Sequence, residues 1–359
     1  MNNQNDYNDN KKITYHEQTD ISNILKLREV LKTLPPFCRD YFRATDPVTT
    51  TNTRISYAYD IRIFFQFLLD ENPAFKNYSL KDFTVDVLDQ LKAVDIEEYL
   101  EYLKVYKNGD KTETNGERGM KRKLSALRSF YAYYFKHEFI KTNPTVLVDV
   151  PKIHDKSIIR LDSDEVALLL DHIEHCGDEL TGQKRAYYEK TKERDLAIVT
   201  LLLGTGIRVS ECVGLDVEDI DFKNNGIKIT RKGGNEMVVY FGPEVERALR
   251  QYLEVREGVT PVTGHEHALF YSTQRKRIGI QAVENLVKKY ARAITTTKKI
   301  TPHKLRSTYG TALYQETGDI YLVADVLGHR DVNTTKKHYA AMDDARRRKA
   351  ASAVHLRED

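Results

Sequence analysis

The chain has 359 residues, of which 40% are hydrophobic and 30% charged, enough apolar material for two packed domains with a well-solvated surface. Its formal charge is only +3 although 56 residues are Lys or Arg, so bulk charge favours a nucleic-acid binder no more than an ordinary soluble protein. We expect no membrane span and no secretion signal, because no sufficiently long apolar run is present. The three scattered cysteines, without a CxxC pair, favour a reduced, cytoplasmic protein.

The first part of the chain predicts a polar tail followed by a helical domain. Residues 1–20 are rich in Asn and Asp, which predicts disorder. Over residues 21–150 we expect an all-helical domain of four or five helices. Its clearest segments are TTTNTRISYAYDIRIFFQFLLDEN, which opens with capping residues, VDIEEYLEYLKVYK, and GERGMKRKLSALRSFYAYYFKHEFI, which is first basic and then aromatic.

A linker and a second domain follow. Residues 151–160 carry Pro and charge without periodicity, which predicts an exposed linker. The second domain is expected over residues 161–359, starting with a helix capped by Asp162 or Ser163. Next come a helix, a turn marked by Gly204 and Gly206, another helix, and two strands in GIKITRKGGNEMVVYF. Four more helical patterns make this domain mainly α with a small sheet.

Two basic residues in the first half of this domain could bind a phosphate. Arg208, in GTGIRVSE, stands where a helix begins after a glycine turn, and a helix start favours an anion. An ion pair with Glu211 is the ordinary structural alternative. Lys232, in TRKGGNE, stands at the tip of the predicted hairpin and could donate a proton to a leaving oxygen. A solvated turn lysine is the alternative there.

The second half of the domain carries two further motifs. HKLR places His303 and Arg306 three residues apart, directly after a helix-starting proline, so a guanidinium and an imidazole share one helix face. LGH places His329 after a glycine, and Tyr339 is the only tyrosine between His329 and the C-terminus. A phenol is a poor nucleophile at its normal pKa of about 10, so it needs nearby cations. Taken singly, His303 also fits an ordinary residue at a helix start, Arg306 a surface arginine and Tyr339 a packed core residue.

In this order, Arg208, Lys232, HKLR, LGH and Tyr339 resemble the active site of the tyrosine recombinases, the integrase and Xer class. The resemblance covers roughly residues 45–345. It implies a mainly α fold, with a helical, SAM-like core-binding N-terminal domain and a mixed, mostly helical catalytic domain that has a small β-sheet and a C-terminal helix. Two features depart from many members: Ser307 stands where a second His is common, and the interval from His329 to Tyr339 is one residue longer.

The resemblance implies a site-specific recombinase that cleaves and rejoins duplex DNA through a 3′-phosphotyrosine intermediate. Its role would be resolution of chromosome or plasmid dimers, or integration and excision of a mobile element. Tyr339 would be the nucleophile, Arg208 and Arg306 would hold the non-bridging oxygens, and Lys232 would protonate the 5′ oxygen. His303 would act as acid and base toward the tyrosine, and His329 would bind the phosphate. Because the sequence holds no GxxxxGK[ST] loop and no metal-ligand cluster, we expect no ATP, metal or other cofactor.

The expected partner is a double-stranded DNA recombination site, bound by a homotetramer in the synaptic complex, with the C-terminal tail docked on a neighbouring protomer. Basic residues of the first domain are candidate phosphate contacts, although each also fits a solvated helix face: Arg54, Arg62, Lys121, Arg122, Lys123 and Arg128.

Two other classes of protein share parts of this pattern. A type IB topoisomerase-like enzyme would nick and relax DNA without exchanging partners, and synapsis of two sites would distinguish it. A DNA-binding regulator could keep the fold without catalysis, and covalent trapping of Tyr339 would distinguish that case.

Overall fold

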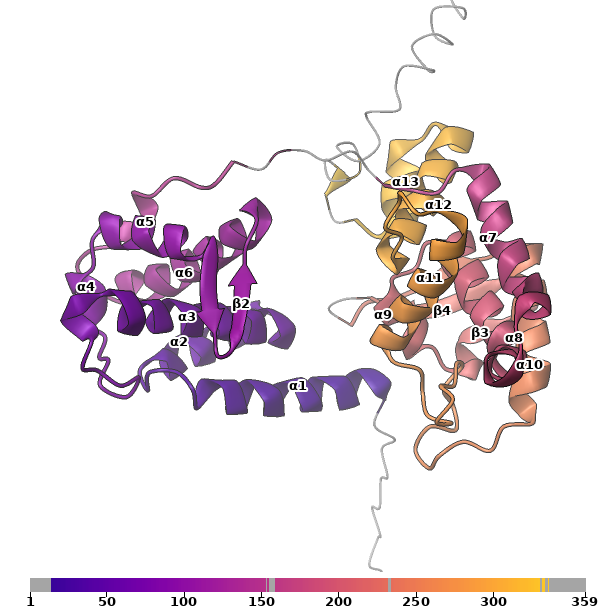
Figure 1. The fold of residues 1–359 in the computed structure, drawn as a ribbon, viewed down its shortest axis with the longest axis horizontal. Coiled ribbons are helices and arrows are strands. Elements are labelled where there is room, and N and C mark those ends of the chain that lie inside the picture. Colours follow the sequence, from indigo (N-terminus) through magenta and orange to yellow (C-terminus); the bar gives the residue numbers. More distant parts are fainter. Residues whose placement is uncertain are drawn as a thin grey trace, which may run out of the picture. The chain divides into compact units, whose positions relative to one another are not determined.

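The computed structural model of the chain describes residues 14–152, 154, 159–231, 234–329, 331, 332 and 335. The chain divides into two compact units, Met1–Asp155 and Lys156–Asp359 (Figure 1). The division falls inside the segment 151–160 that the composition suggests as a linker. Among the residues described, no helix is both long and apolar enough to cross a membrane.

The first unit is mostly helical. In chain order its elements are α1 (Tyr15–Leu31), α2 (Cys38–Ala44), η1 (Asp46–Val48), α3 (Thr51–Glu71), η2 (Pro73–Phe75), α4 (Val87–Gln90), α5 (Ala93–Tyr102), β1 (Val105–Asn108), β2 (Lys111–Thr114), α6 (Glu117–Lys136) and η3 (Pro144–Val146).

Helix α1 begins earlier than the composition predicts. Thr14 and Glu17 form a capping box, in which the Thr14 main-chain N donates to Glu17 Oε2 at 2.7 Å and the Glu17 N donates to Thr14 Oγ1 at 3.3 Å. These bonds satisfy amide groups that a helix start leaves without partners. The prediction of a disordered tail is therefore wrong for residues 15–20, and residues 1–13 lie outside the described residues.

Aromatic side chains form the core of the first unit. Phe130 of α6 is fully buried and meets Tyr41 of α2 and Phe65 of α3 edge-on, with ring centroids 5.3 and 6.3 Å apart. Edge-on aromatic pairs contribute about 0.5–1.5 kcal/mol each beyond the burial of their surface. The aromatic run in the α6 sequence thus joins three helices around one point.

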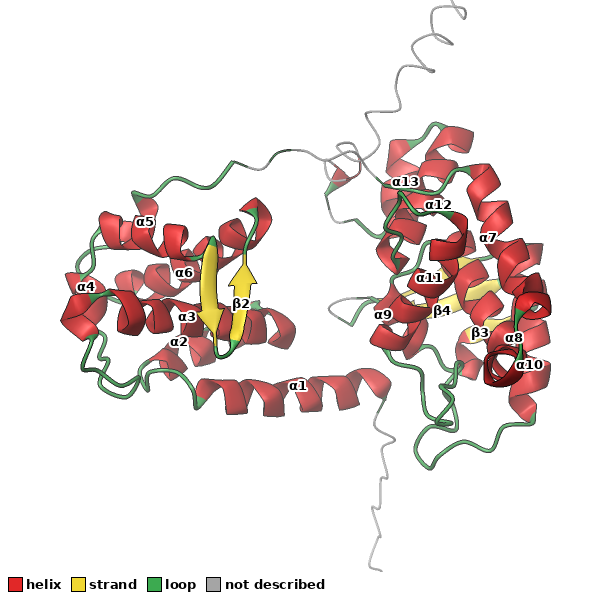
Figure 2. Cartoon of the chain, in the orientation of Figure 1, coloured by secondary structure: helices red, strands yellow, loops and turns green. Residues whose placement is uncertain are grey.

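A β-hairpin replaces the end of a helix that the sequence predicts (Figure 2). The segment VDIEEYLEYLKVYK has a helical pattern, but α5 ends at Tyr102, and β1 and β2 then pair antiparallel from Val105↔Thr114 to Asn108↔Lys111. Gly109 adopts a left-handed φ of +62° in the turn. Because Asn-Gly between strand-forming residues is a strong hairpin signal, the dipeptide Asn108-Gly109 could have indicated this feature. The all-helical prediction for residues 21–150 is wrong here.

The second unit combines helices with one small sheet. Its elements are α7 (Ser163–His175), η4 (Cys176–Glu179), α8 (Gly182–Thr205), α9 (Val209–Gly214), η5 (Val217–Asp219), β3 (Ile220–Asp221), β4 (Gly226–Thr230), β5 (Glu236–Tyr240), α10 (Pro243–Glu257), α11 (Ile280–Ile294), α12 (Pro302–Thr317) and α13 (Ile320–Leu327). The predicted cap of α7 is confirmed, since the Asp162 N donates to Glu165 Oε2 at 2.8 Å. The antiparallel sheet has the order β3-β4-β5.

Helix α8 is the central element of this unit and packs against α7, α10 and α12. Its buried Asp195 accepts from Arg194 Nε at 3.0 Å and from the hydroxyl of Tyr290 on α11, also at 3.0 Å. The two glycines of the predicted turn have different roles. Gly206 ends α8 with a φ of +63°, whereas Gly204 lies within the helix, where a Cβ would come within 2.4 Å of Val245 on α10. Gly204 therefore permits close helix packing, and the turn belongs to Gly206 alone.

Candidate active site

Arg208 lies immediately before α9, as the GTGIRVSE motif predicts. Its main-chain N donates to Glu211 Oε2 and its Nη1 donates to Glu211 Oε1, both at 2.7 Å. The Glu211 side chain is only 4% exposed, whereas that of Arg208 is 37% exposed. A buried carboxylate thus orients a guanidinium that remains partly accessible. The ion pair with Glu211 and a ligand-binding role are therefore compatible.

Arg306 is buried in α12. The helix begins at Pro302, whose fixed φ suits a first helical position. Nη1 of Arg306 donates to the carbonyl oxygen of Gly206, and Nη2 donates to that of Leu327. Arg306 therefore links the end of α8 to the end of α13. His303 lies three residues earlier on the same helix face and is exposed.

The LGH motif is the C-terminal cap of α13. The Gly328 N donates to the Asp325 carbonyl at 2.8 Å and the His329 N donates to the Ala324 carbonyl at 2.9 Å. These are the paired hydrogen bonds of a Schellman turn, which needs a left-handed residue such as Gly328, whose φ is +61°. The turn fixes the backbone of His329. The imidazole Nδ1 lies 2.7 Å from the Thr335 hydroxyl.

Three guanidinium groups meet the carbonyl groups at this end of α13. Arg306 donates to Leu327, and Arg208 Nη2 donates to Gly328 at 3.3 Å. Arg231, which the sequence did not single out, donates to Val326 at 2.7 Å. The last carbonyls of a helix lack partners within it and carry partial negative charge, so they attract cations. The end of α13 thus gathers side chains from α12, the start of α9 and the end of β4, beside His329.

Two of the predicted catalytic residues, Lys232 and Tyr339, lie outside the described residues. The described residues nearest to them in the sequence, Arg231 and Thr335, lie at the end of α13 that carries His329. Of the predicted catalytic set, Arg208, Arg306 and His329 are brought together at the α13 terminus.

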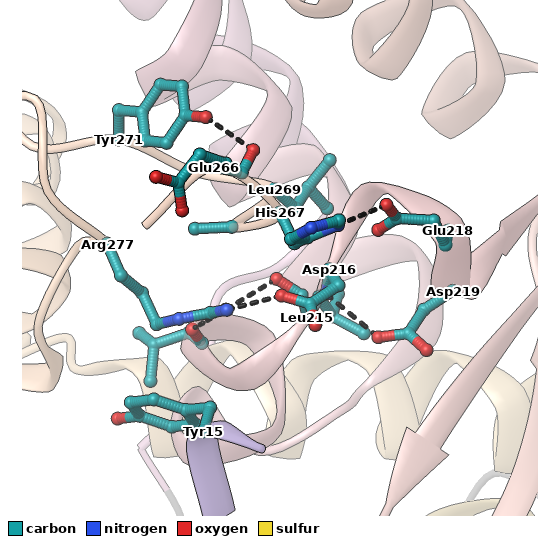
Figure 3. Close-up of polar contacts among 12 residues, drawn as sticks. Tyr15, Leu215, Asp216, Glu218, Asp219, Glu266, His267, Leu269, Tyr271 and Arg277 are labelled. Carbon is teal, nitrogen blue, oxygen red and sulfur yellow. Dashed lines mark hydrogen bonds and ion pairs between the residues drawn. The ribbon is translucent and has the colours of Figure 1, made fainter. Parts of the chain in front are cut away.

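Arg277 supports α9 from its other end (Figure 3). Its Nη1 donates to the carbonyl oxygens of Val213 at 3.1 Å and Leu215 at 2.7 Å, and its Nη2 pairs with Asp216. The side chain of Arg277 is 11% exposed. Because these bonds hold the C-terminal end of a six-residue helix, they also restrain its N-terminal end, where Arg208 lies.

Three of the basic residues predicted to contact DNA have structural partners. Arg54 is 11% exposed and pairs with Asp46. Lys123 is buried and donates to Asn115 Oδ1 at 2.9 Å. Arg128 donates to two carbonyl oxygens that follow α6, from Nε to Thr145 at 3.0 Å and from Nη2 to Val148. Each of these side chains therefore stabilises the domain, and a DNA contact by any of the three stays a prediction.

The other three basic residues present accessible charge. Lys121 is exposed on α6, and Arg62 of α3 lies over the ring of Tyr59 at 5.1 Å. Arg122 is 49% exposed and forms a two-pronged ion pair with the buried carboxylate of Asp60. Burial raises the pKa of Asp60, although Arg122 and Lys123 both act to lower it.

Comparison with known proteins gives a family and close relatives. The model of the phage integrase family matches residues 160–346. The chain is 32% identical over 341 residues to tyrosine recombinase XerS of Lactococcus lactis subsp. cremoris (strain MG1363), an alignment that covers 88% of this chain and 93% of the relative. It is also 32% identical over 348 residues to tyrosine recombinase XerC of Caldanaerobacter subterraneus subsp. tengcongensis, covering 93% and 91%.

Solved structures share the fold. The XerH site-specific recombinase bound to a palindromic difH substrate, in its post-cleavage complex, aligns with a TM-score of 0.61 and 22% identity, covering 84% of this chain and 79% of that one. The Tn1549 transposon integrase in complex with circular intermediate DNA aligns with a TM-score of 0.60 and 22% identity, covering 84% and 94%. The predicted mainly α architecture with a small sheet is confirmed.

Proposed function

Because the chain belongs to the phage integrase family and is a tyrosine recombinase, an enzyme that cleaves and rejoins DNA at specific sites, we propose that Tyr339 is its nucleophile. The observation that carries this proposal is the meeting of Arg208 and Arg306 beside His329 at the end of α13. Two cations and an imidazole in one place suit a phosphodiester whose negative charge increases as it reacts. Tyr339 follows His329 in the same C-terminal segment.

In the proposed reaction the Tyr339 oxygen attacks the scissile phosphorus. A bond from phosphorus to the phenolic oxygen forms, the bond to the 5′ oxygen breaks, and the products are a 3′-phosphotyrosine and a free 5′-hydroxyl. His303 takes the phenolic proton, and Lys232 gives a proton to the leaving oxygen. Rejoining is the reverse sequence. The phosphodiester energy is retained in the covalent intermediate, so neither ATP nor a metal ion is required.

The two arginines would share the non-bridging oxygens unequally. Arg306 is 5% exposed and already donates to two carbonyl groups, so it offers a fixed and buried hydrogen-bond donor. Arg208 is more exposed and is oriented by Glu211, so it would make the more accessible contact. A preorganised donor of this kind typically contributes about 10²–10³-fold in rate. His329 would donate a third hydrogen bond to the phosphate.

The partner in this proposal is a duplex DNA recombination site, bound by a homotetramer during synapsis. Residues 21–150 would act as the core-binding domain, the segment 151–160 as linker, and residues 161–359 as the catalytic domain. Lys121, Arg62 and the exposed part of Arg122 would contact phosphates and position the domain without reading sequence.

We further propose an Xer-like role in the cytoplasm. The chain aligns over about nine-tenths of the XerS and XerC relatives as well as of itself, so the similarity to these Xer proteins extends over both units. Resolution of chromosome or plasmid dimers fits this build, and integration or excision of a mobile element is the other role of the same chemistry.

A recombination assay tests the proposed function. The bound sequence is first selected from random duplexes, and two copies are then placed as direct repeats on a supercoiled plasmid. We expect the wild-type chain to yield two smaller circles in buffer with EDTA and without ATP. Relaxation without exchange would favour a topoisomerase-like enzyme, and binding without any strand cleavage would favour a regulator.

A further inference from the structure

Arg231 joins the end of β4 to the C-terminal end of α13. Its Nη2 donates to the Val326 carbonyl at 2.7 Å, and its Nη1 donates to the Asp325 carbonyl at 3.4 Å. Both acceptors belong to the last turn of the helix, where carbonyl groups lack helical partners and attract positive charge. One side chain therefore ties the small sheet to the helix that carries His329. Lys232 is the next residue in the chain.

The main chain of Arg231 also closes the connection between β4 and β5. Its N donates to the Asn235 carbonyl at 2.8 Å, and its own carbonyl accepts from the Gly234 N at 3.0 Å. Gly234 has a φ of +83°, a conformation that glycine adopts without strain. Lys232 and Gly233 stand between Arg231 and Gly234 in the sequence. Both described ends of the connection, Arg231 and Gly234, are therefore held by hydrogen bonds.

The guanidinium of Arg231 packs against the backbone of Gly328. A Cβ at position 328 would come within 1.6 Å of Nη1 and 2.2 Å of Cζ. Gly328 thus has two reasons to be glycine, its left-handed φ of +61° and the space that Arg231 occupies. Lysine could not replace this contact, because a single ammonium lacks the planar fork that reaches two successive carbonyl groups.

Arg231 also lies within electrostatic reach of the Arg208–Glu211 pair. Burial lowers the pKa of Arg231 from its usual value, the Glu211 carboxylate opposes that change, and Arg208 adds to it. Arginine stays cationic at neutral pH in spite of such shifts. The same carboxylate therefore offsets repulsion between Arg208 and Arg231, which bind carbonyl groups at the C-terminal end of α13.

We propose that Arg231 is a positioning residue, which fixes the root of the β4–β5 connection on α13 and so places Lys232 for protonation of the leaving 5′ oxygen. This inference rests on the proposed role of Lys232 as the acid. Arg231 itself transfers no proton. The proton passes from Lys232 Nζ to the 5′ oxygen as the bond between phosphorus and that oxygen breaks, and it returns to the amine when the strand is rejoined.

A sulfur-substituted substrate separates positioning of the acid from other effects. In a duplex with sulfur in place of the bridging 5′ oxygen, the leaving group is a thiol, whose pKa is about 8.5, against about 15.7 for water. A thiolate leaves without being protonated, so loss of the acid no longer slows cleavage. Single-turnover cleavage rates are measured on the oxygen and sulfur substrates for the wild type, Arg231→Ala, Arg231→Lys, Lys232→Ala and the Arg231→Ala/Lys232→Ala double variant.

Arg231→Ala should lower cleavage of the oxygen substrate by about 100-fold, the scale of a misplaced catalytic group. On the sulfur substrate it should come within a few-fold of the wild type. On the oxygen substrate, the cleavage rate of Arg231→Lys should lie between those of the wild type and Arg231→Ala, because lysine keeps the charge but lacks the two-pronged guanidinium. The double variant should be no slower than Lys232→Ala, because both changes remove the same proton transfer.

The outcomes separate this inference from the proposed function. The sulfur substrate could restore the cleavage rate of Lys232→Ala but not that of Arg231→Ala. Lys232 would then be the acid and Arg231 would act in another way, which overturns the inference. The inference is also overturned if the fold reduction in the cleavage rate of the double variant equals the product of the reductions in the two single variants. If Lys232→Ala itself is not restored, the acid role in the proposed function fails. Thermal melting shows whether Arg231→Ala is folded. If it is not, Arg231→Lys tests the inference alone: its slower cleavage of the oxygen substrate must return to the wild-type rate on the sulfur substrate.

Discussion

Arg208 and Arg306 donate to the carbonyl oxygens of two consecutive residues, Gly328 and Leu327, at the C-terminal end of α13. The negative end of a short helix thus holds two like charges side by side, which would otherwise repel each other. Because the Schellman turn that provides these carbonyls also fixes the backbone of His329, one helix end organises three of the proposed catalytic groups.

Arg306→Ala should abolish measurable recombination and also destabilise the second unit. The change removes a fixed phosphate donor, for which a loss of about 10²–10³-fold in cleavage rate is expected. It also leaves two buried carbonyls without partners, which costs about 2 kcal/mol or more. Single-turnover cleavage and urea unfolding measure the two effects. Arg185→Ala, on an exposed part of α8, is the matched control, and an Arg306→Ala enzyme as active as that control would contradict the assignment.

Arg128→Ala and Lys121→Ala on α6 should affect different properties, the first stability and the second DNA binding. Arg128 holds the carbonyl groups of Thr145 and Val148, so its removal should lower the free energy of unfolding by about 2 kcal/mol. Lys121 is exposed, so Lys121→Ala should leave unfolding unchanged. Instead it should weaken DNA binding and reduce the slope of log affinity against log salt by about 1. Unchanged affinity and slope in Lys121→Ala would remove it as a phosphate contact.

Asp60→Asn should change how stability depends on pH. Burial raises the pKa of Asp60 in the folded chain, so the folded chain keeps this proton at pH values where the unfolded chain, with a pKa of about 3.9, has released it. The contribution of Asp60 to stability therefore falls as pH rises through the raised pKa. Wild type should lose stability relative to Asp60→Asn as the pH rises above about 4 in urea titrations. A relative gain would mean that the pairs with Arg122 and Lys123 outweigh burial.

The cysteines should react with a thiol reagent in a fixed order. Burial raises the pKa of Cys212 to about 12 and that of Cys38 well above its usual value, and both thiols are buried. Because the thiolate is the reactive species, neither should react quickly at about pH 8 in the folded protein. Cys176 is only partly buried and should react first, and Cys176→Ser should remove that signal. Rapid reaction of two thiols in the native protein would contradict the packing of α2 or α9.

The sequence predicts most of the helices because their signals are local. Three of these signals each act within a few residues: the capping box of Asp162 and Glu165, the proline at 302 and the LGH motif. The start of α7, the start of α12 and the end of α13 therefore follow directly from the sequence. The pattern does not predict the hairpin at 105–114, because the helical periodicity of LEYLKVYK continues past the point where α5 ends, and Asn108-Gly109 is the one local signal of the turn.

Roles that depend on distant partners could not be predicted in this way. Arg128 is indistinguishable from a surface arginine until the carbonyls of Thr145 and Val148 are placed beside it. Arg231 likewise acquires its role from α13, far away in sequence. The proposed catalytic set could be assigned from the sequence because the family resemblance lies in the order of its residues, which needs no knowledge of their distances.

The most direct measurement concerns the covalent bond to Tyr339. A nicked suicide duplex carrying the selected site releases a short 5′-terminated fragment on cleavage, which prevents rejoining and traps the protein on the 3′ phosphate. We expect the wild type to form a covalent adduct, peptide mapping to place the DNA on Tyr339, and Tyr339→Phe to form none. An adduct on another residue, or an adduct that persists in Tyr339→Phe, would contradict the account.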